Sequence, residues 1–293
     1  MNTLLVAMPT AAAADLPTWI LWTLSFWLGA SVGSFLNVCI YRIPEDESVV
    51  RPASRCPGCR TPIAWYDNVP IVSWLALRGR CRRCGIAIAA RYPFVEAATG
   101  GLAVLALWQL GPTVAALIAF CFTAALLMIT FIDFDHLFIP DEVSLPGILV
   151  GLGLAALPTG IGVANAAIGA ALGGGLLWLV AWSYERSTGT EGMGLGDVKL
   201  LAMIGAFLGW QAIPMVLIVA SMSGSLAGVL VIFGARGRRA IGRVRRTLGG
   251  GAVLPFIRRA ARRTAIPFGP FLALGAVIVR YVPSITLPLS LGA

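Results

Sequence analysis

Long runs of apolar residues fill most of this sequence, and they limit the possible folds more than any other feature. A helix that crosses a bilayer needs about 20 mainly apolar residues. Eight runs meet or approach this length: Pro17–Tyr41, Phe94–Leu110, Thr113–Ile132, Val143–Leu157, Ile161–Trp182, Val198–Leu208, Ala212–Phe233 and Ile266–Val282. The fourth and sixth runs are short. The pattern predicts an all-α polytopic membrane protein with about eight transmembrane helices.

The composition agrees with this prediction and leaves no room for a large soluble domain. Of the 293 residues, 58% are hydrophobic and only 12% are charged, whereas soluble domains carry about 25% charged residues. A net charge of +9 would suggest nucleic-acid binding in a soluble protein. Here the basic residues lie between the spans, where they act as an orientation signal. We therefore expect membrane lipid as a partner and no nucleic acid.

Two connections hold most of the arginines and predict which side of the membrane they occupy. Nine arginines lie in Arg42–Arg91 and ten in the loop 235–265, while the three shortest turns have none. With eight spans, both arginine-rich connections fall on one side. Short basic connections stay in the cytoplasm, so both termini are expected outside. The residues before Pro17 then form an uncleaved external tail.

Four of the six cysteines form two CxxC pairs between the first and second runs. Twenty-one residues separate Cys56 and Cys59 from Cys81 and Cys84, a spacing close to that of zinc ribbons. Four thiolates close a tetrahedral structural Zn²⁺ site. The connection is predicted to be cytoplasmic, where disulfides are rare. These cysteines therefore indicate a bound Zn²⁺ rather than two disulfides.

The apolar runs and the cysteine pairs together predict three parts of the chain. Residues 1–42 form an external N-terminus and the first span. The cysteine segment, defined as residues 43–93, is a small zinc-ribbon-like cytoplasmic insertion between the first two transmembrane helices. Residues 94–293 form the membrane domain, which contains the basic cytoplasmic loop 235–265.

Few acids lie beside the spans, and two of them are predicted at the same membrane face. Asp133 ends the third run and Asp197 precedes the sixth. Two spans separate them, so the chain has returned to the same side. Ionisable groups at membrane depth are costly and indicate functional sites. A structural alternative exists for Asp197, and for Asp141 after Pro140, because aspartates also cap helices.

Asp133 and Asp197 have the chemistry of an aspartyl dyad if their helices pack. Two carboxyls a few ångströms apart cannot both ionise, so one keeps a proton while the other acts as a base. The base deprotonates a water that attacks a peptide carbonyl, and the protonated partner stabilises the oxyanion. Gly194 and Gly196 would let an extended substrate approach closely.

The stretches around these aspartates resemble a known family. "GMGLGDVKL" (192–200) matches the GxGD motif of the type IV prepilin peptidases, and "IDFDHLFIPDE" (132–142) matches their first-aspartate motif. The resemblance continues, in order along the chain, through "GSFLNVCIYRIP", "NVPIVSWLALRGRCRRCG", "ARYPFVE" and "IPFGPFLALGA". In that family the catalytic pair falls on the positions of Asp133 and Asp197.

The resemblance implies a bifunctional enzyme of the bacterial inner membrane. Its substrates would be type IV prepilins or type II secretion pseudopilins, cut after a glycine at the cytoplasmic face. The new N-terminus would then be N-methylated with S-adenosylmethionine, an activity that the family associates with the cysteine segment. No glycine-rich fingerprint for S-adenosylmethionine is visible, so methylation is predicted from the resemblance alone.

Two further residues near the motifs have open interpretations. Glu96 either pairs with Arg91 or binds substrate. Lys199, the only lysine in the chain, is either a solvated interfacial amine or a charge that tunes the dyad.

Two other functions also fit the acids. A divalent-metal-dependent membrane transferase would use Asp133, Asp135 and Asp197 as Mg²⁺ ligands, and a chelator would stop it. An ion-coupled transporter would use interfacial aspartates as a proton relay, but its acids should lie near mid-membrane. The span count instead places both aspartates at one face.

Overall fold

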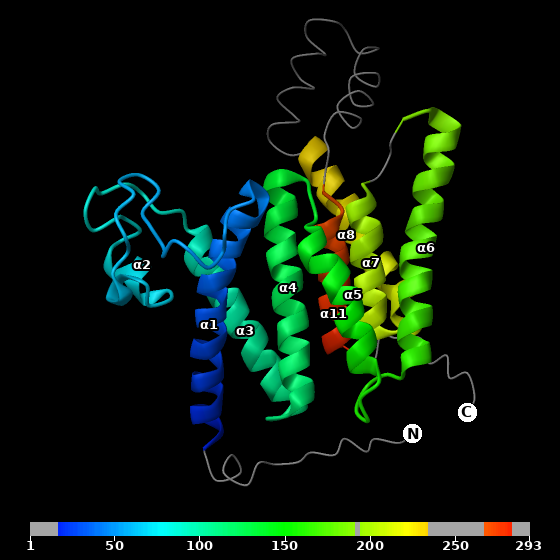
Figure 1. Cartoon of the computed structure of the whole chain (residues 1–293), viewed down its shortest axis with the longest axis horizontal. Coiled ribbons are helices and arrows are strands. Elements are labelled where there is room, and N and C mark those ends of the chain that lie inside the picture. The colour runs from blue at the N-terminus through cyan, green and yellow to red at the C-terminus, as the bar shows by residue number, and fades with distance from the viewer. Residues whose placement is uncertain (1–16, 191–193, 234–266, 283–293) are drawn as a thin grey trace, which may run out of the picture.

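The chain folds into a bundle of helices with a small irregular segment beside it (Figure 1). The computed structural model describes residues 17–190, 194–233 and 267–282. The predicted external tail and the basic loop 235–265 lie outside these residues. Within them, every regular element is a helix, apart from two isolated bridges in the cysteine segment.

Each of the eight apolar runs contains a helix, and five of the helices that the structure describes have the length of a span. The bounds are α1 Thr18–Arg42, α3 Arg91–Leu110, α4 Val114–His136, α5 Asp141–Ala155, α6 Val163–Thr188, α7 Leu195–Leu208, α8 Ile213–Phe233 and α11 Gly269–Tyr281. Among the described helices, α1, α3, α4, α6 and α8 are long and apolar enough to cross a membrane. The helices α5, α7 and α11 have 15, 14 and 13 residues, below the about 20 that a crossing needs. The predicted count of eight spans is therefore not confirmed.

Local sequence explains where α4 ends, where α5 begins and where α7 ends. The helix α4 ends at His136, and the following residue, Leu137, has a left-handed φ of 55° and donates its N–H to the carbonyl of Asp133. Pro140 then precedes α5, since its fixed φ suits the start of a helix and its missing N–H needs no partner. Gly209, with a φ of 80°, ends α7, as glycine commonly does.

The helix α7 lies at the centre of the larger part of the bundle. It packs against α5, α6 and α11, while α11 also packs against α4 and α8. Leu126 of α4, Leu200 and Ile204 of α7 and Leu272 of α11 are fully buried there. Lipid tails are as apolar as leucine, so close packing rather than water exclusion holds such helices together. This packing sets the end of α4 beside the starts of α7 and α11.

The cysteine segment lies lateral to α1 and α3 in Figure 1. It contains a short helix, α2 (Val72–Ala76), and two 3-10 turns, η1 (Ile43–Glu45) and η2 (Trp65–Asp67). Arg42, the last residue of α1, donates to the carbonyls of Ser48 and Pro52 at 2.9 and 2.8 Å. These bonds hold the first residues of the cysteine segment against the end of α1. With so little regular structure, the segment depends on side-chain contacts of this kind.

Candidate active site and metal centre

Asp133 occupies a buried position in the last turn of α4. The residue is 5% exposed, and its Oδ2 has no hydrogen-bond partner among the described residues. The backbone N–H of Gly269, the first residue of α11, is a polar neighbour of the carboxyl without meeting hydrogen-bond geometry to Oδ2. A buried carboxyl oxygen without a partner disfavours the charged form. This oxygen is therefore available to a proton, a water or a substrate.

Asp197 lies in the first turn of α7, at the same end of the bundle as the end of α4 (Figure 1). Its side chain does not cap the helix, because the N-cap is Gly194 and no side-chain cap bond is made. Asp133 is close enough to act on it electrostatically. Ile139 joins the two sides, since a Cβ added at Gly196 or at Gly269 would lie 3.0 or 3.1 Å from its side chain. The fold thus brings the two predicted aspartates into one neighbourhood.

Lys199 pairs with Asp141. Its Nζ donates to both carboxyl oxygens at 2.7 Å, and this contact joins α7 to the start of α5. Asp141 does not cap α5 with its side chain, because Pro140 is the N-cap. The lysine is therefore neither an unpaired interfacial amine nor a direct partner of the dyad. Its ion pair links α7 to α5.

Of the two interpretations of Glu96, pairing with Arg91 is not what the structure shows. Arg91, at the start of α3, instead pairs with Asp135 in the last turn of α4. Glu96 is 8% exposed, and its Oε2 accepts the backbone N–H of Ile71 at 2.7 Å. Both contacts cross between segments, so neither acid is simply solvated.

The four cysteines of the two CxxC pairs converge as the spacing predicted. Their Sγ atoms all lie within 4.8 Å of one another, and those of Cys56 and Cys84 are 3.7 Å apart. A tetrahedral metal with sulfur at about 2.3 Å needs its ligands about 3.8 Å apart, whereas a disulfide needs about 2.05 Å. All four are free thiols. The arrangement fits one metal ion.

Two loops of the same form present these thiols. The N–H of Cys56 donates to the carbonyl of Thr61 at 3.0 Å, and that of Cys81 donates to Ile86 at 2.9 Å. Each loop then turns through a left-handed residue just after its second cysteine: Arg60 has a φ of 55° and Gly85 a φ of 72°. The repeated hydrogen bond folds each pair so that both of its sulfurs point to one place.

Hydrogen bonds around two of the cysteines, Cys59 and Cys81, favour the thiolates that a metal requires. The Thr61 hydroxyl donates to the Sγ of Cys59 at 3.2 Å and, with the Thr61 backbone, lowers the pKa of that thiol to about 6. The backbone N–H groups of Cys84 and Arg83 lower the pKa of Cys81. A thiolate accepts such bonds better than a thiol, so they favour the metal-binding form of these two residues.

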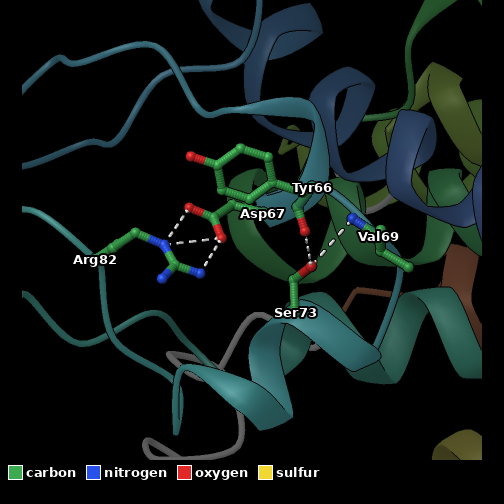
Figure 2. Close-up of polar contacts among 5 residues, drawn as sticks. All are labelled: Tyr66, Asp67, Val69, Ser73 and Arg82. Atoms are coloured by element: carbon green, nitrogen blue, oxygen red, sulfur yellow. Dashed lines mark hydrogen bonds and ion pairs between the residues drawn. The ribbon is translucent and has the colours of Figure 1, made fainter.

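Arg82, between the two cysteines of the second pair, is held by the turn η2, as Figure 2 shows. Its Nε and Nη2 both donate to the carboxylate of Asp67, the shortest bond being 2.7 Å. Its guanidinium also lies 5.6 Å from the ring centroid of Tyr66. The Arg82 hydrogen bonds hold the pKa of Asp67 below its ordinary value. This support was not predicted from the sequence, where Asp67 has no distinguishing pattern.

Comparisons with known proteins agree with this arrangement. Residues 27–110 match the bacterial peptidase A24 N-terminal domain, and residues 120–229 match the type IV leader peptidase family. The chain belongs to the type IV leader peptidase family. It is 37% identical to a prepilin leader peptidase/N-methyltransferase of Aeromonas hydrophila, over 96% of this chain and 97% of the relative. A relative of the same name from Myxococcus xanthus strain DK1622 is 45% identical over 71% of this chain and 62% of its own length.

For this member of the leader peptidase family, the comparisons separate the competing functions. A further relative from Burkholderia pseudomallei strain 1026b, 38% identical over 92% of this chain, carries the same double name. Neither the metal-dependent transferase nor the ion-coupled transporter receives support. No solved structure matches the chain.

Gly269 and Ile139 were not among the predicted site residues. Both stand in stretches that carry the family resemblance, "IPFGPFLALGA" and "IDFDHLFIPDE". The signal for them was therefore present, but nothing in the residue types themselves indicates contact with an aspartate.

Proposed function

We propose that Asp133 and Asp197 form the catalytic dyad with which this protein cleaves leader peptides from type IV prepilins. The observation that carries the proposal is the buried Oδ2 of Asp133, which has no partner in the part of the chain that the structure describes. Asp197 lies at the same end of the bundle, in the first turn of α7. One carboxyl keeps a proton while the other removes one from water. The resulting hydroxide attacks the scissile carbonyl, and the protonated carboxyl donates to the developing oxyanion. The peptide C–N bond then breaks as the carboxyl that took the proton from water gives it to the leaving amine, and the other carboxyl recovers its proton from the new carboxyl product. The two carboxyls titrate as a coupled pair, so neither aspartate is assigned as the acid or as the base.

Leader cleavage is followed by N-methylation of the new N-terminus, the second activity in the relatives' shared name. S-adenosylmethionine, the donor implied by the resemblance, would supply the methyl group. The described residues hold no arrangement that we assign to binding it. We extend the substrates to pseudopilins of type II secretion, whose leaders the same dyad would cut.

The metal at the four cysteines is Zn²⁺ in this proposal. Four thiolates in tetrahedral order are the ligand set of structural zinc sites, and such a site has no open position for a substrate. Its contribution is to folding, because a segment with so little regular structure gains its stability from the ion. The site would release zinc, and the local fold with it, when a chelator removes the ion.

The protein lies in the bacterial inner membrane with the dyad and the cysteine segment at the cytoplasmic face and both termini outside. The arginines of Arg42–Arg91 support this orientation, since short basic connections stay in the cytoplasm. Anionic lipid would contact these arginines.

Co-expression with a prepilin tests the dyad. Asp133→Asn and Asp197→Asn keep side-chain size but remove the shared-proton chemistry, so each should abolish cleavage while the protein still inserts. Glu142→Gln is the matched control, because Glu142 is exposed at the start of α5. Near-normal cleavage by Asp133→Asn would refute the assignment and direct attention to Asp135 or Asp141.

A further inference from the structure

Glu96 lies where three parts of the chain outside the proposed dyad come together: α1, α3 and the cysteine segment. The residue belongs to "ARYPFVE" at the start of α3, and its carboxyl accepts the N–H of Ile71 in the cysteine segment at 2.7 Å. On its other side α1 comes very close, since a Cβ at Gly33 would lie 2.8 Å from the Cα of Glu96. Ser34 of α1 is a second polar neighbour of the carboxyl. A single buried acid of α3 therefore lies against α1 and bonds to the segment that joins the two helices.

The backbone that Glu96 holds is in an unfavourable conformation. Ile71 has a φ of 61° and a ψ of −52°, and the N–H of Val72 donates to the carbonyl of Pro70 at 2.5 Å. These values describe a γ-turn with a positive central φ, a rare and strained form. A β-branched residue is especially disfavoured there. Such a turn persists only when its surroundings hold it, and the Glu96 carboxyl bonds directly to its central N–H.

The γ-turn at Ile71 sets the direction of the rest of the segment. The helix α2 begins at the next residue, and Ser73 within it donates to the carbonyl of Tyr66 at 2.9 Å and accepts the N–H of Val69 at 3.1 Å (Figure 2). Trp74 donates to the carbonyl of Ile88 at 3.0 Å, just beyond the second CxxC loop. The cysteine site is thus linked through α2 to the turn, and through the turn to Glu96.

We infer that Glu96 is a positioning residue, whose carboxyl holds the strained turn at Ile71 and thereby fixes the cysteine segment against α1 and α3 for methylation of the pilin. The inference rests on the proposed role of the segment in methylation. Glu96 does not act on the substrate in this scheme. Its one described hydrogen bond is to the protein's own backbone, so it acts through the placement of the segment.

The test uses full-length enzyme, a prepilin substrate, and mass spectrometry of the pilin N-terminus. Glu96→Ala removes the acceptor, and it should lower the methylated fraction by about tenfold or more, since misplacing a group by about 1 Å can cost about 100-fold. Cleavage and metal content should stay near the wild-type values. Glu96→Gln keeps an oxygen acceptor and should methylate within about threefold of wild type, as neutral acceptors weaken rather than remove such bonds. Glu185→Ala, an exposed glutamate near the end of α6, is the control.

A second substitution tests the turn itself. Glycine takes a positive φ without strain, so Ile71→Gly combined with Glu96→Ala should restore most of the methylation. Ile71→Ala removes the same side chain but keeps the strain, so it should not restore activity to Glu96→Ala. The inference is wrong if Glu96→Ala methylates normally, if Glu96→Gln is as defective as Glu96→Ala, or if Ile71→Ala rescues as well as Ile71→Gly. Failure of the proposed function would look different, because the wild-type enzyme would then neither cut nor methylate the pilin.

Discussion

The backbone of Gly269 lies directly against the carboxyl of Asp133. A Cβ at position 269 would be 2.5 Å from Oδ2, closer than any real Cβ contact. The start of α11 therefore forms one wall of the candidate active site, although more than a hundred residues separate it from α4 in the sequence. This contact leads to the first prediction.

Gly269→Ala should displace the Asp133 carboxyl and lower the rate of leader cleavage by about 100-fold, as expected when a reacting group shifts by about 1 Å. The rate of cleavage of a prepilin in detergent or nanodiscs measures the effect. Gly101→Ala is the matched control, because a Cβ at Gly101 meets no atom within 4 Å. Normal cleavage by Gly269→Ala would mean that α11 does not confine Asp133.

The ion pair of Lys199 and Asp141 should contribute little on its own. Its side chains are 31% and 51% exposed, and exposed pairs contribute about 0–1 kcal/mol. Lys199→Met and Asp141→Asn should therefore each keep cleavage within about fivefold of wild type. The double variant should be no worse than the single ones. If either single variant loses cleavage as completely as Asp197→Asn, the lysine charge acts on the dyad itself.

Asp67→Asn should accelerate metal loss from the cysteine site without preventing its assembly. The bond to Arg82 steadies the second CxxC loop, and a single ion pair at the surface contributes only a small part of the stability. Zinc transfer to a chromogenic chelator should become about two- to fivefold faster. Asp46→Asn, in the same segment, is the control. Unchanged release from Asp67→Asn would show that the metal alone holds the loop.

The pH dependence of that difference follows from the lowered pKa of Asp67. A carboxyl with a depressed folded-state pKa contributes stability above its unfolded pKa of about 3.9, and this is lost as the pH falls through the folded-state value. The ratio of the two release rates should therefore stay constant between about pH 5 and pH 8. A ratio that changes within this window would assign the effect to another titrating group.

Damage to the cysteine site and to the dyad should have separable effects. The cysteines lie between α1 and α3, whereas the aspartates belong to α4 and α7. Cys81→Ser should unfold the segment locally and lose methylation before it loses cleavage. Asp197→Asn should abolish cleavage while methylation of a pre-cut pilin persists. Mass spectrometry of the pilin N-terminus reads both results.

Two outcomes would contradict this separation. Loss of cleavage in every cysteine variant at normal protein levels would place the segment within the protease site. Zinc analysis adds a second check, since purified protein should hold about one zinc per chain and a Cys56→Ser/Cys81→Ser double variant should hold none. Two disulfides in protein prepared without oxidation would exclude both the metal and a cytoplasmic segment.

Much of the architecture could be predicted because it depends on local properties. Apolar length indicated the eight helical runs, and the spacing of two CxxC pairs indicated one four-sulfur site. Three of the eight helices are shorter than a span; the short fourth and sixth runs indicated this for α5 and α7, but the eighth run did not indicate it for α11. Pro140 marks the start of α5 and Gly209 the end of α7, where backbone geometry interrupts a continuous apolar pattern.

The sequence by itself determined which residue types were present for chemistry: two aspartates in recognisable motifs and four thiols at metal-binding spacing. Only the tertiary structure decided their polar partners. Arg91 pairs with Asp135 rather than with Glu96, and Glu96 binds the backbone of Ile71. These contacts join positions that are 44 and 25 residues apart. A side chain's nearest neighbours across such separations depend on how whole helices pack, and no local pattern records that packing.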